Sequence, residues 1–211
     1  MGEYTPTVFV VDDDPSIRES ISLLLKSAGY SVKTFPSAKE YLEWERDTPG
    51  PTCLVLDVKM PGLTGLDLQK ELQSRNDFTP IIFMTGHGDI PMSVQAMKKG
   101  AVDFLSKPFD DSDLLEAVKG ALLKDSQAQA DLKNQMRILQ KVDSLTSREQ
   151  EVLSYLITGM LNKQIAHELG ISERTVKAHR KQVFDKMGVD SMAELVRLTE
   201  KVGVKPANVP S

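Results

Sequence analysis

The sequence predicts an α/β domain with a parallel five-stranded sheet, joined through a helical segment to a smaller all-helical domain. Three observations predict this arrangement. Short apolar runs alternate with helical patterns over the first part of the chain, which is typical of a parallel sheet covered by helices on both faces. Residues 111–142 are rich in Leu, Lys, Gln and Ala, most of them good helix formers. The remainder shows helical patterns alone, and 211 residues are enough for two domains.

Five apolar runs account for the expected strands, and apolar residues at helical spacing lie between them. The strands are Val8–Val11, Ser31–Phe35, Cys53–Leu56, Ile81–Met84 and Val102–Leu105. The helical patterns are those of Ile17, Ile21, Leu24 and Leu25, of Leu66, Leu68 and Leu72, and of Val94 with Met97. Five strands within about 120 residues fit the flavodoxin-like strand order 2-1-3-4-5.

The segment after the expected sheet allows two interpretations. Its apolar residues fit a 3-4 heptad spacing if Asp125 and Gln129 occupy two seam positions. The apolar members are Leu115, Val118, Leu122, Leu132, Met136 and Leu139. The segment is either the last helix of the α/β domain followed by a polar linker, or one long helix that pairs with a second subunit.

The last part of the chain contains four helical patterns. The stretch from Leu145 to Gln150 has the signature of a capped helix start. Three further patterns follow at Asn162–Leu169, Ser172–Met187 and Ser191–Val202. Gly170 and Gly188 are placed to end the first two of these.

Charge and cysteine content limit the classes of function. Residues 1–124 hold 13 basic against 19 acidic residues, a net −6, and residues 125–211 hold 13 against 11, a net +2. An acidic half joined to a mildly basic half suggests two separate roles. Cys53 is the sole cysteine, which excludes an internal disulfide and a cysteine-based zinc site. Neither a signal peptide nor a membrane span is visible, so we expect a cytoplasmic protein without a membrane partner.

Polar residues follow four of the expected strands. Asp12, Asp13 and Asp14 follow the first strand, Asp57 the third, Thr85 the fourth and Lys107 the fifth. Because the carboxyl ends of parallel strands meet at one edge of the sheet, these groups converge there. Asp14 precedes a proline and is expected to act only as a helix cap.

The convergent groups suit phosphoryl transfer. Clustered carboxylates need a cation, and hard oxygen ligands favour Mg²⁺. Asp57 could then attack phosphorus as a carboxylate nucleophile. Lys107 would pair with a phosphoryl oxygen, and Thr85 would donate a hydrogen bond to it.

Three stretches of this first part carry a resemblance to a known family. The sequences VVDDDPSIR, LVLDVKMPGLTGLDL and IIFMTGHGDIPMSVQAMKKGAVDFLSKPF resemble the receiver domain of two-component response regulators, in particular the FixJ branch. The match covers about residues 5–124. The resemblance implies that Asp57 is phosphorylated and that Lys107 pairs with the phosphoryl group. It also implies that Mg²⁺ is held by Asp12, Asp13, Asp57 and the backbone carbonyl of Lys59. Thr85 and Phe104 would form a conformational switch, and Pro108 would follow a cis peptide bond. His87 is expected to be a solvent-facing loop residue.

The second part carries its own pattern, a helix, a glycine turn and a basic helix. Arg174, Lys177, Arg180 and Lys181 crowd the second helix, which can therefore enter a major groove of DNA. Residues 143–202, from LTSREQEVL through KMGVDSMAELV, resemble the LuxR-type DNA-binding domain. The resemblance implies that Lys177, Ala178 and Lys181 face bases and that Asn162, Lys163, Arg174, Thr175 and Arg180 reach phosphates. Leu161 departs from the family, which often has serine there.

These observations together predict a response-regulator transcription factor. The expected domains are a receiver at 1–124, a helical linker at 125–142 and a DNA-binding domain at 143–211. The expected partners are a sensor histidine kinase, double-stranded promoter DNA, a second copy after activation and, from the family, RNA polymerase. Apart from self-dephosphorylation, no turnover enzyme is expected.

Two alternatives compete with this prediction. Phosphatases of the haloacid dehalogenase type also place a nucleophilic Asp after a strand, with a second Asp two residues later. Lys59 occupies that second position here, which disfavours turnover of small phosphoesters. The other alternative is a DNA-binding protein whose receiver dimerises without phosphate.

Overall fold

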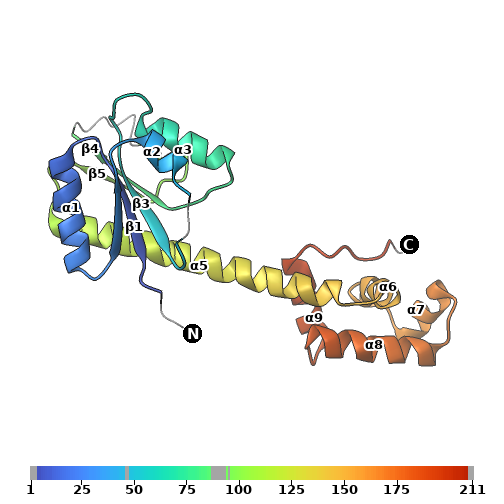
Figure 1. Ribbon diagram of the computed structural model, residues 1–211. Helices are drawn as coiled ribbons and strands as arrows, with labels where there is room; N and C mark the ends of the chain where they lie inside the picture. The colour runs from blue at the N-terminus through green and yellow to red at the C-terminus, as the bar shows by residue number, and fades with distance from the viewer. Residues whose placement is uncertain (1–3, 46–47, 87–93, 95, 209–211) are drawn as a thin grey trace. The chain divides into compact units, whose positions relative to one another are not determined.

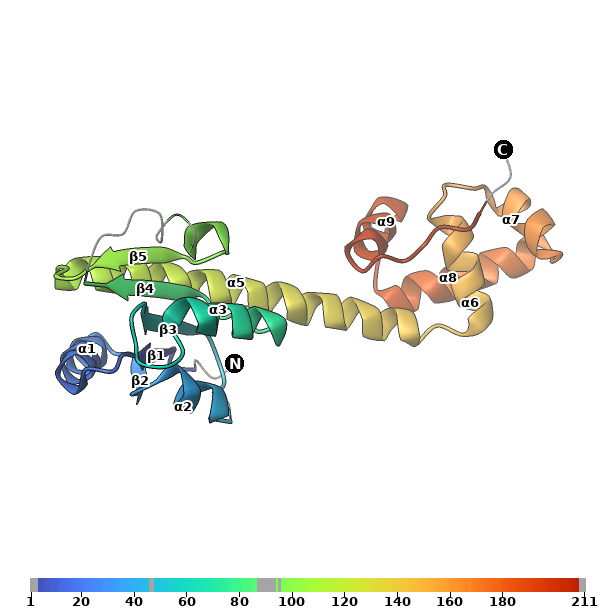
Figure 2. The same ribbon diagram turned by 90° about the horizontal axis from the view of Figure 1, so that it is seen from above.

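The computed structural model describes residues 4–45, 48–86, 94 and 96–208 (Figures 1 and 2). The chain divides into two compact units, residues 1–129 and 130–211. Each unit buries its own set of apolar side chains. Among the helices of these described ranges, none combines the length and the apolar character needed to cross a bilayer.

A parallel five-stranded sheet forms the centre of the first unit. Its order, β2-β1-β3-β4-β5, confirms the predicted one. The strands are β1 (Thr7–Val11), β2 (Ser31–Phe35), β3 (Thr52–Asp57), β4 (Ile81–Thr85) and β5 (Asp103–Ser106). Every residue of β1, β3 and β4 is buried. Because both faces of the sheet are covered at these strands, their sequences are nearly unbroken runs of apolar residues.

Helices cover the two faces of this sheet. They are α1 (Pro15–Ser27), α2 (Ala38–Glu43), α3 (Gly65–Ser74) and α5 (Asp111–Asp143). Phe9, Leu54 and Phe83 belong to one apolar core together with residues of α2 and α3. Val55 and Met84 belong to the other core, together with residues of α1 and α5. Because side chains alternate along a strand, each strand supplies both cores.

Two helical segments differ in how well the sequence predicts them. The apolar spacing does not predict α2, which is only six residues long. Its signal is the capping residue Ser37, whose hydroxyl accepts from the Glu40 amide at 3.2 Å. The pattern of Val94 and Met97, and the loop position of His87, fall in a segment where residues 87–93 and 95 lie outside the described residues.

The segment from Asp111 to Asp143 forms one helix of 33 residues, which confirms that this region is one continuous helix; its pairing with a second subunit stays a prediction. The two polar seam positions are engaged within the first unit. Asp125 Oδ2 accepts from the Thr52 amide at 2.7 Å and from Gln129 Nε2 at 2.8 Å. Gln129 Nε2 also donates to the Gly50 carbonyl at 3.0 Å. We call Asp125 and Gln129 the α5 clasp, since they tie α5 to the start of β3.

Four helices and the end of α5 build the second unit. They are α6 (Ser147–Leu156), α7 (Asn162–Leu169), α8 (Glu173–Met187) and α9 (Met192–Lys201). Gly170 and Gly188 end α7 and α8 with φ of 62° and 63°, a left-handed conformation that favours glycine. The predicted ends of both helices are thereby confirmed. Ile138 of α5 is 3% exposed and belongs to this second core.

A buried carboxylate organises the start of α6. Thr146 and Glu149 form a capping box, in which Glu149 Oε2 accepts from the Thr146 amide at 2.8 Å. Lys186 Nζ of α8 lies 2.6 Å from the same oxygen. The Lys186 ion pair and the Thr146 amide together hold the pKa of Glu149 below its usual value. The ionised glutamate therefore stabilises the contact between α6 and α8.

The start of α7 has only half of such a cap. Leu161 stands at the N-cap position, where its side chain has no acceptor for the helix amides. Gln164 Oε1 accepts from the Leu161 amide at 2.8 Å, so the reciprocal bond alone is made. The departure of Leu161 from serine thus changes the cap and leaves the helix in place.

We expect Glu149→Gln to lower the melting temperature of the second unit at pH 7, because the charge that pairs with Lys186 is lost. A lowered carboxyl pKa contributes stability above the unfolded value, near 4.3, and that stability disappears as pH falls through the folded value. The difference from the parent should therefore vanish in acid. Calorimetry from pH 3 to pH 7 measures it, and Trp44 fluorescence identifies the transition of the first unit.

Glu151→Gln is the matched control for this prediction. The Glu151 side chain is 51% exposed and pairs with Arg148 on the same helix. Exposed pairs of this kind contribute little to stability. Equal losses for the two variants, or a loss for Glu149→Gln that does not change with pH, would contradict the stabilising role of Glu149.

Candidate functional site

Three charged side chains from three strand ends meet at the carboxyl edge of the sheet in the first unit. Asp12 follows β1, Asp57 ends β3 and Lys107 follows β5. Lys107 Nζ lies 2.6 Å from Asp12 Oδ2 and 2.8 Å from Asp57 Oδ1. Asp12 is 1% exposed and Asp57 is 6% exposed. A single ammonium group therefore bridges two buried carboxylates.

This bridge determines the electrostatics of the edge. Burial raises the pKa of Asp57, although the hydrogen bond and charge of Lys107 oppose that rise. Burial lowers the pKa of Lys107, but its hydrogen bonds to Asp12 and Asp57 outweigh burial and leave that pKa raised. Lys107 thus stays charged at neutral pH.

Backbone amides complete the coordination of the two carboxylates. The Lys59 amide donates to Asp57 Oδ2 at 2.9 Å, and the Asp14 amide donates to Asp12 Oδ1 at 2.9 Å. Each carboxylate therefore has one oxygen on Lys107 and the other on the backbone. These bonds fix the orientation of both acids before any ligand arrives.

Gly65, the first residue of α3, also shapes the backbone around Asp57. It was not among the site residues expected from the polar groups at the strand ends. Its amide donates to the Val58 carbonyl at 3.1 Å, which closes the loop after β3. A Cβ at this position would come into steric clash with the backbone carbonyl of Asp57. Its signal in the sequence is the run PGLTG, which begins four residues after Asp57. Any other residue at this position would force the loop behind Asp57 to shift.

Asp13 and Asp14, the other two acidic residues of the loop after β1, have different roles. Asp14 caps α1, since its Oδ1 accepts from the Ser16 amide at 2.8 Å and from the Ile17 amide at 3.4 Å. This confirms its expected role as a cap. Asp13 is exposed beside the buried Asp12. Its carboxylate is therefore accessible to a ligand from solvent.

Thr85 and Phe104 lie on neighbouring strands next to the charged cluster. Thr85 ends β4 and is 1% exposed, and its carbonyl accepts from the Lys107 amide at 2.7 Å. Phe104 of β5 is partly buried, with its ring centroid 6.5 Å from that of Phe83. The peptide bond between Lys107 and Pro108 is cis, which confirms that expectation. The backbone thus connects the cluster to both expected switch residues.

The donor set can be compared with the needs of Mg²⁺. Among residues 4–45, 48–86, 94 and 96–208, no three acidic, histidine or cysteine side chains are grouped closely enough to hold a metal ion. Mg²⁺ does not require three, because it usually takes one or two carboxylates and keeps several waters. Asp12 and Asp57 already share one cation, and Asp13 is open beside them. The residues present fit a magnesium ion held partly by water.

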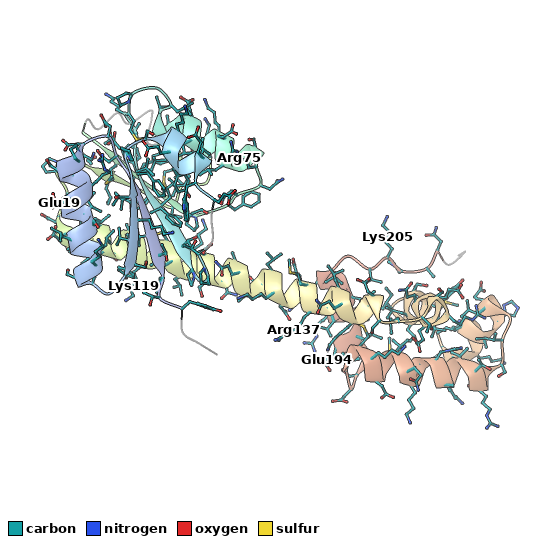
Figure 3. The ribbon with its side chains drawn as sticks, viewed as in Figure 1. Glu19, Arg75, Lys119, Arg137, Glu194 and Lys205 are labelled. Carbon is teal, nitrogen blue, oxygen red and sulfur yellow. The ribbon has the colours of Figure 1, made fainter. Side chains whose placement is uncertain are left out.

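The second unit contains the predicted helix-turn-helix, formed by α7 and α8. Val176, Val183 and Met187 bury one side of α8. Arg174, Lys177, Ala178 and Lys181 are exposed on the same helix. Figure 3 shows side chains of α8 projecting away from the rest of this unit. The arrangement presents a basic, solvent-facing helix surface.

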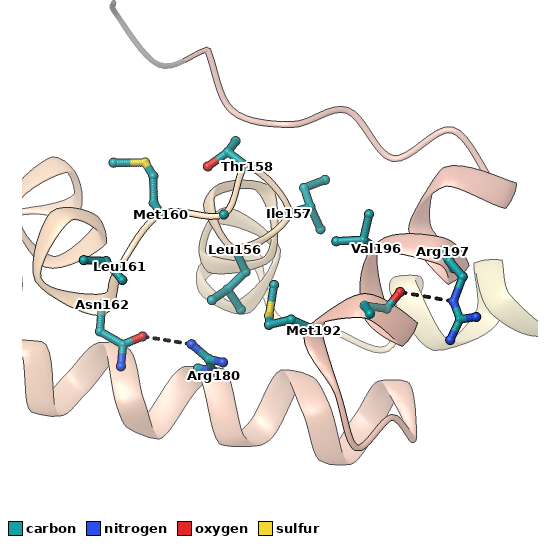
Figure 4. A pocket seen from close by; sticks show the side chains of 12 residues that line it. Leu156, Ile157, Thr158, Met160, Leu161, Asn162, Arg180, Met192, Val196 and Arg197 are labelled. Atoms are coloured by element: carbon teal, nitrogen blue, oxygen red, sulfur yellow. Dashed lines mark hydrogen bonds between the residues drawn. The ribbon is translucent and has the colours of Figure 1, made fainter.

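Three of the other residues expected to contact DNA, Arg180, Asn162 and Thr175, are held by neighbours. Arg180 Nη1 donates to Asn162 Oδ1 at 3.3 Å, which joins α8 to the start of α7 (Figure 4). The Arg180 guanidinium also lies 5.3 Å from the centre of the Phe184 ring. The Thr175 hydroxyl lies 2.8 Å from that of Ser172, the cap of α8. Lys163 is exposed on α7.

A hollow of about 930 Å³ opens beside Asn162 and Arg180 (Figure 4). The loop from Ile157 to Leu161 forms one side, and α9 residues Met192 and Val196 form another. Leu161 is 70% exposed at its rim. This hollow adjoins the basic surface and contains two of the expected phosphate contacts.

Sequence comparisons assign both units to known families. Residues 8–119 match the response regulator receiver domain, and residues 143–199 match the luxR family of bacterial regulatory proteins. The first match covers the three charged residues of the sheet edge. The second covers α6, α7, α8 and most of α9.

Relatives match this chain along nearly its whole length. Nodulation protein W of Bradyrhizobium diazoefficiens is 49% identical over 93% of this chain and 86% of its own. The transcriptional regulatory protein FixJ of Azorhizobium caulinodans is 43% identical over 99% of this chain and 98% of its own. The solved structure of the response regulator StyR has a TM-score of 0.83 at 50% identity, covering 93% of this chain and 99% of its own.

We expect Lys107→Ala to lower the free energy of unfolding of the first unit by about 3 kcal/mol at pH 7, because two buried carboxylates lose their shared cation. The loss should shrink as pH falls, because protonation of Asp57, whose pKa burial raises, removes the repulsion. Urea unfolding followed by Trp44 fluorescence measures it, and added Mg²⁺ should restore part of the stability.

Lys59→Ala serves as the control for Lys107→Ala. Lys59 is exposed and contacts Asp57 through its backbone amide, which alanine retains. Its unfolding midpoint should match that of the parent. If Lys107→Ala also matched the parent, the bridge would have no net stabilising role.

Proposed function

The chain belongs to the response regulators of two-component systems that carry a LuxR-type DNA-binding domain, and we propose that phosphorylation of Asp57 controls its binding to promoter DNA. The observation that carries this proposal is the bridge of Lys107 between Asp12 and Asp57. The Lys107 ammonium can exchange its contact with the Asp57 carboxylate for one with a phosphoryl oxygen.

The phosphoryl group comes from a phosphohistidine of a sensor histidine kinase. A carboxylate oxygen of Asp57 attacks phosphorus, a P–O bond forms and the P–N bond of the donor breaks. The Lys59 amide fixes one oxygen of Asp57 before the attack. Lys107 then moves from Asp57 Oδ1 to an oxygen of the new phosphoryl group.

Asp12, Asp13, Asp57 and the backbone carbonyl of Lys59 would hold Mg²⁺. The ion supplies charge neutralisation for the incoming phosphoryl group. Asp12 is already oriented by the Asp14 amide, and Asp13 faces solvent beside it. The two acids can therefore receive the ion without rearrangement of β1.

Thr85 and Phe104 pass the change to the surface of the first unit. The Thr85 hydroxyl donates to the phosphoryl group, and the Phe104 ring turns into the space that Thr85 vacates. The bond from the Lys107 amide to the Thr85 carbonyl supports this coupling, because it joins β4 to the residue that binds phosphate. The switched surface favours dimers.

The second unit binds double-stranded promoter DNA with α8 in the major groove. Lys177, Ala178 and Lys181 face base edges, and their exposure supports this role. Asn162, Lys163, Arg174, Thr175 and Arg180 reach phosphates. The bonds that Arg180 and Thr175 already make orient them for that contact.

The functional boundaries follow from this division of labour. The receiver is residues 1–124, the helical linker 125–142 and the DNA-binding domain 143–211. The family ranges 8–119 and 143–199 support these limits. A dimer places two DNA-binding domains on paired half-sites, which raises affinity through effective concentration. The bound dimer contacts RNA polymerase and acts in the cytoplasm.

The family is regulatory, and turnover of small phosphoesters is not part of the proposal. Lys59 stands where a phosphatase of the haloacid dehalogenase type would need an acid or base. Besides accepting the phosphoryl group on Asp57, the chain is assigned only the hydrolysis of the aspartyl phosphate by water, which resets the switch.

We expect Asp57→Asn to abolish phosphorylation, because an amide is not a nucleophile toward phosphorus. Acetyl phosphate followed by phosphate-affinity electrophoresis measures the label. Promoter affinity, measured by fluorescence anisotropy, should rise after treatment of the parent and stay constant for the variant. Asp14→Asn is the control, since asparagine also caps helices and the site is untouched.

A label retained by Asp57→Asn would overturn the assignment of the acceptor. Promoter binding that is equally tight before and after treatment of the parent would instead favour a receiver that dimerises without phosphate.

We expect Lys177→Ala to weaken promoter binding by about 1–3 kcal/mol if it donates to a base. The Lys177 side chain is 63% exposed and its ammonium lies 3.1 Å from Glu173, a surface pair that DNA can replace. Anisotropy on the promoter and on a scrambled duplex measures the loss of specificity. Lys205→Ala removes the same charge from the tail, and it should leave affinity nearly unchanged.

A further inference from the structure

An exposed apolar stripe lies on the part of α5 that follows the α5 clasp. Leu132 and Met136 are each 52% exposed, and Leu139 is 43% exposed. Their spacing of four and three residues places them on one side of the helix. We name these three residues the α5 stripe. Large apolar side chains grouped on a surface helix indicate a binding surface.

The other side of the same helical segment is already occupied. Ile138 is buried in the core of the second unit, and Val142 packs against that core. Lys141 Nζ donates to the Met187 carbonyl at 2.7 Å, at the end of α8. The segment therefore has one side committed to the second unit and a separate apolar side without such a role.

We propose that the α5 stripe pairs with the α5 stripe of a second copy as a short parallel coiled coil. The spacing is that of the a and d positions of a heptad, with Met136 at a and Leu132 and Leu139 at d. An identical stripe on the second copy matches it residue for residue, as a two-fold interface requires. The occupant of this surface is thus another molecule of the same chain.

The flanking charges agree with this pairing. In register, Ala128 of one helix lies beside Lys133 of the other, and Gln135 lies beside Gln140. Neither pair brings like charges together. The charged residues Asp131, Arg137 and Lys141 fall at the outer positions of the heptad. A second helix can therefore approach the stripe without electrostatic repulsion.

The structure also sets the limits of the pairing. Asp125 and Gln129 hold the same heptad seam against the start of β3, so the coiled coil begins at Leu132. It ends before the polar Asp143. Three apolar residues per copy bury far less than the roughly 1,200–2,000 Å² of a stable interface. The stripe therefore acts only when another contact already holds two copies together.

This condition links the stripe to activation and rests on the proposed function. Receivers that dimerise after phosphorylation bring the two α5 helices to high effective concentration. The stripes then close and strengthen the dimer. The unphosphorylated chain, without the receiver contact, stays largely monomeric at the same concentration.

Disulfide cross-linking of the full-length chain tests the pairing. Cys53 is fully buried, and burial raises its thiol pKa far above the usual value, so an introduced cysteine is the reactive one. We expect Leu132→Cys and Leu139→Cys to form disulfide dimers with beryllofluoride present and at least tenfold less without it. Each residue meets itself only in a parallel pair. Asn134→Cys, on the outer side, should not cross-link.

Two outcomes overturn the proposal. One is the absence of cross-links at both Leu132 and Leu139 in either state, whatever the oligomeric state of the chain. The other is equal cross-linking of Asn134→Cys, which indicates random collision. Failure of Asp57 to take a label from acetyl phosphate, measured on portions of the same protein without beryllofluoride, would instead overturn the proposed function and leave the cross-linking result readable.

Sedimentation of charged variants gives a second measurement. Met136→Glu places like charges at the seam of the pair, so we expect the dimer dissociation constant with beryllofluoride to rise at least tenfold. Asn134→Glu adds the same charge on the outer side of the same helical turn and should leave the constant unchanged. An unchanged constant for Met136→Glu would overturn the proposal.

Discussion

The first unit depends on the pairing of two buried carboxylates with one cation. Asp12 and Asp57 lie at the ends of the neighbouring strands β1 and β3, and both are nearly excluded from water. Two unit charges 4 Å apart repel by about 4 kcal/mol at an effective dielectric constant of 20. The Lys107 ammonium offsets this repulsion, but only while β5 holds it at the same edge. The charge balance at this edge therefore depends on the strand order and on the loop after β5, because these place Lys107 beside the two carboxylates.

Much of this arrangement could be predicted, because it depends on short patterns of neighbouring residues in the sequence. Apolar runs fix the strands, and each run ends at a polar residue, so parallel order alone brings Asp12, Asp57 and Lys107 to one edge. The turn between α7 and α8 is equally local, since Gly170 takes the left-handed conformation that a helix end needs. The sequence pattern predicts the structure correctly where the contacts of a residue are determined by the periodicity of the helix or strand that contains it.

Contacts to distant backbone could not be predicted in this way. Asp125 and Gln129 looked like weak positions in a heptad, whereas they bind the backbone of Thr52 and Gly50. Side-chain patterns carry no information about backbone groups more than 70 residues away. Gly65 is similar, because its importance lies in the space beside the Asp57 carbonyl. The path of the whole chain shows which backbone groups these residues contact.

The anchoring of Ile138 and Lys141 has a consequence for how the DNA-binding head can be separated from the rest. Ile138 fills the head's core, and Lys141 places a positive charge at the carbonyl end of α8. A head excised at residue 143 would have a gap in its interior and would lose the bond from Lys141 to the Met187 carbonyl at the end of α8. A DNA-binding head that can be moved between proteins therefore includes the last turns of α5. Gene fusions or domain exchanges that keep these turns with the head preserve its core.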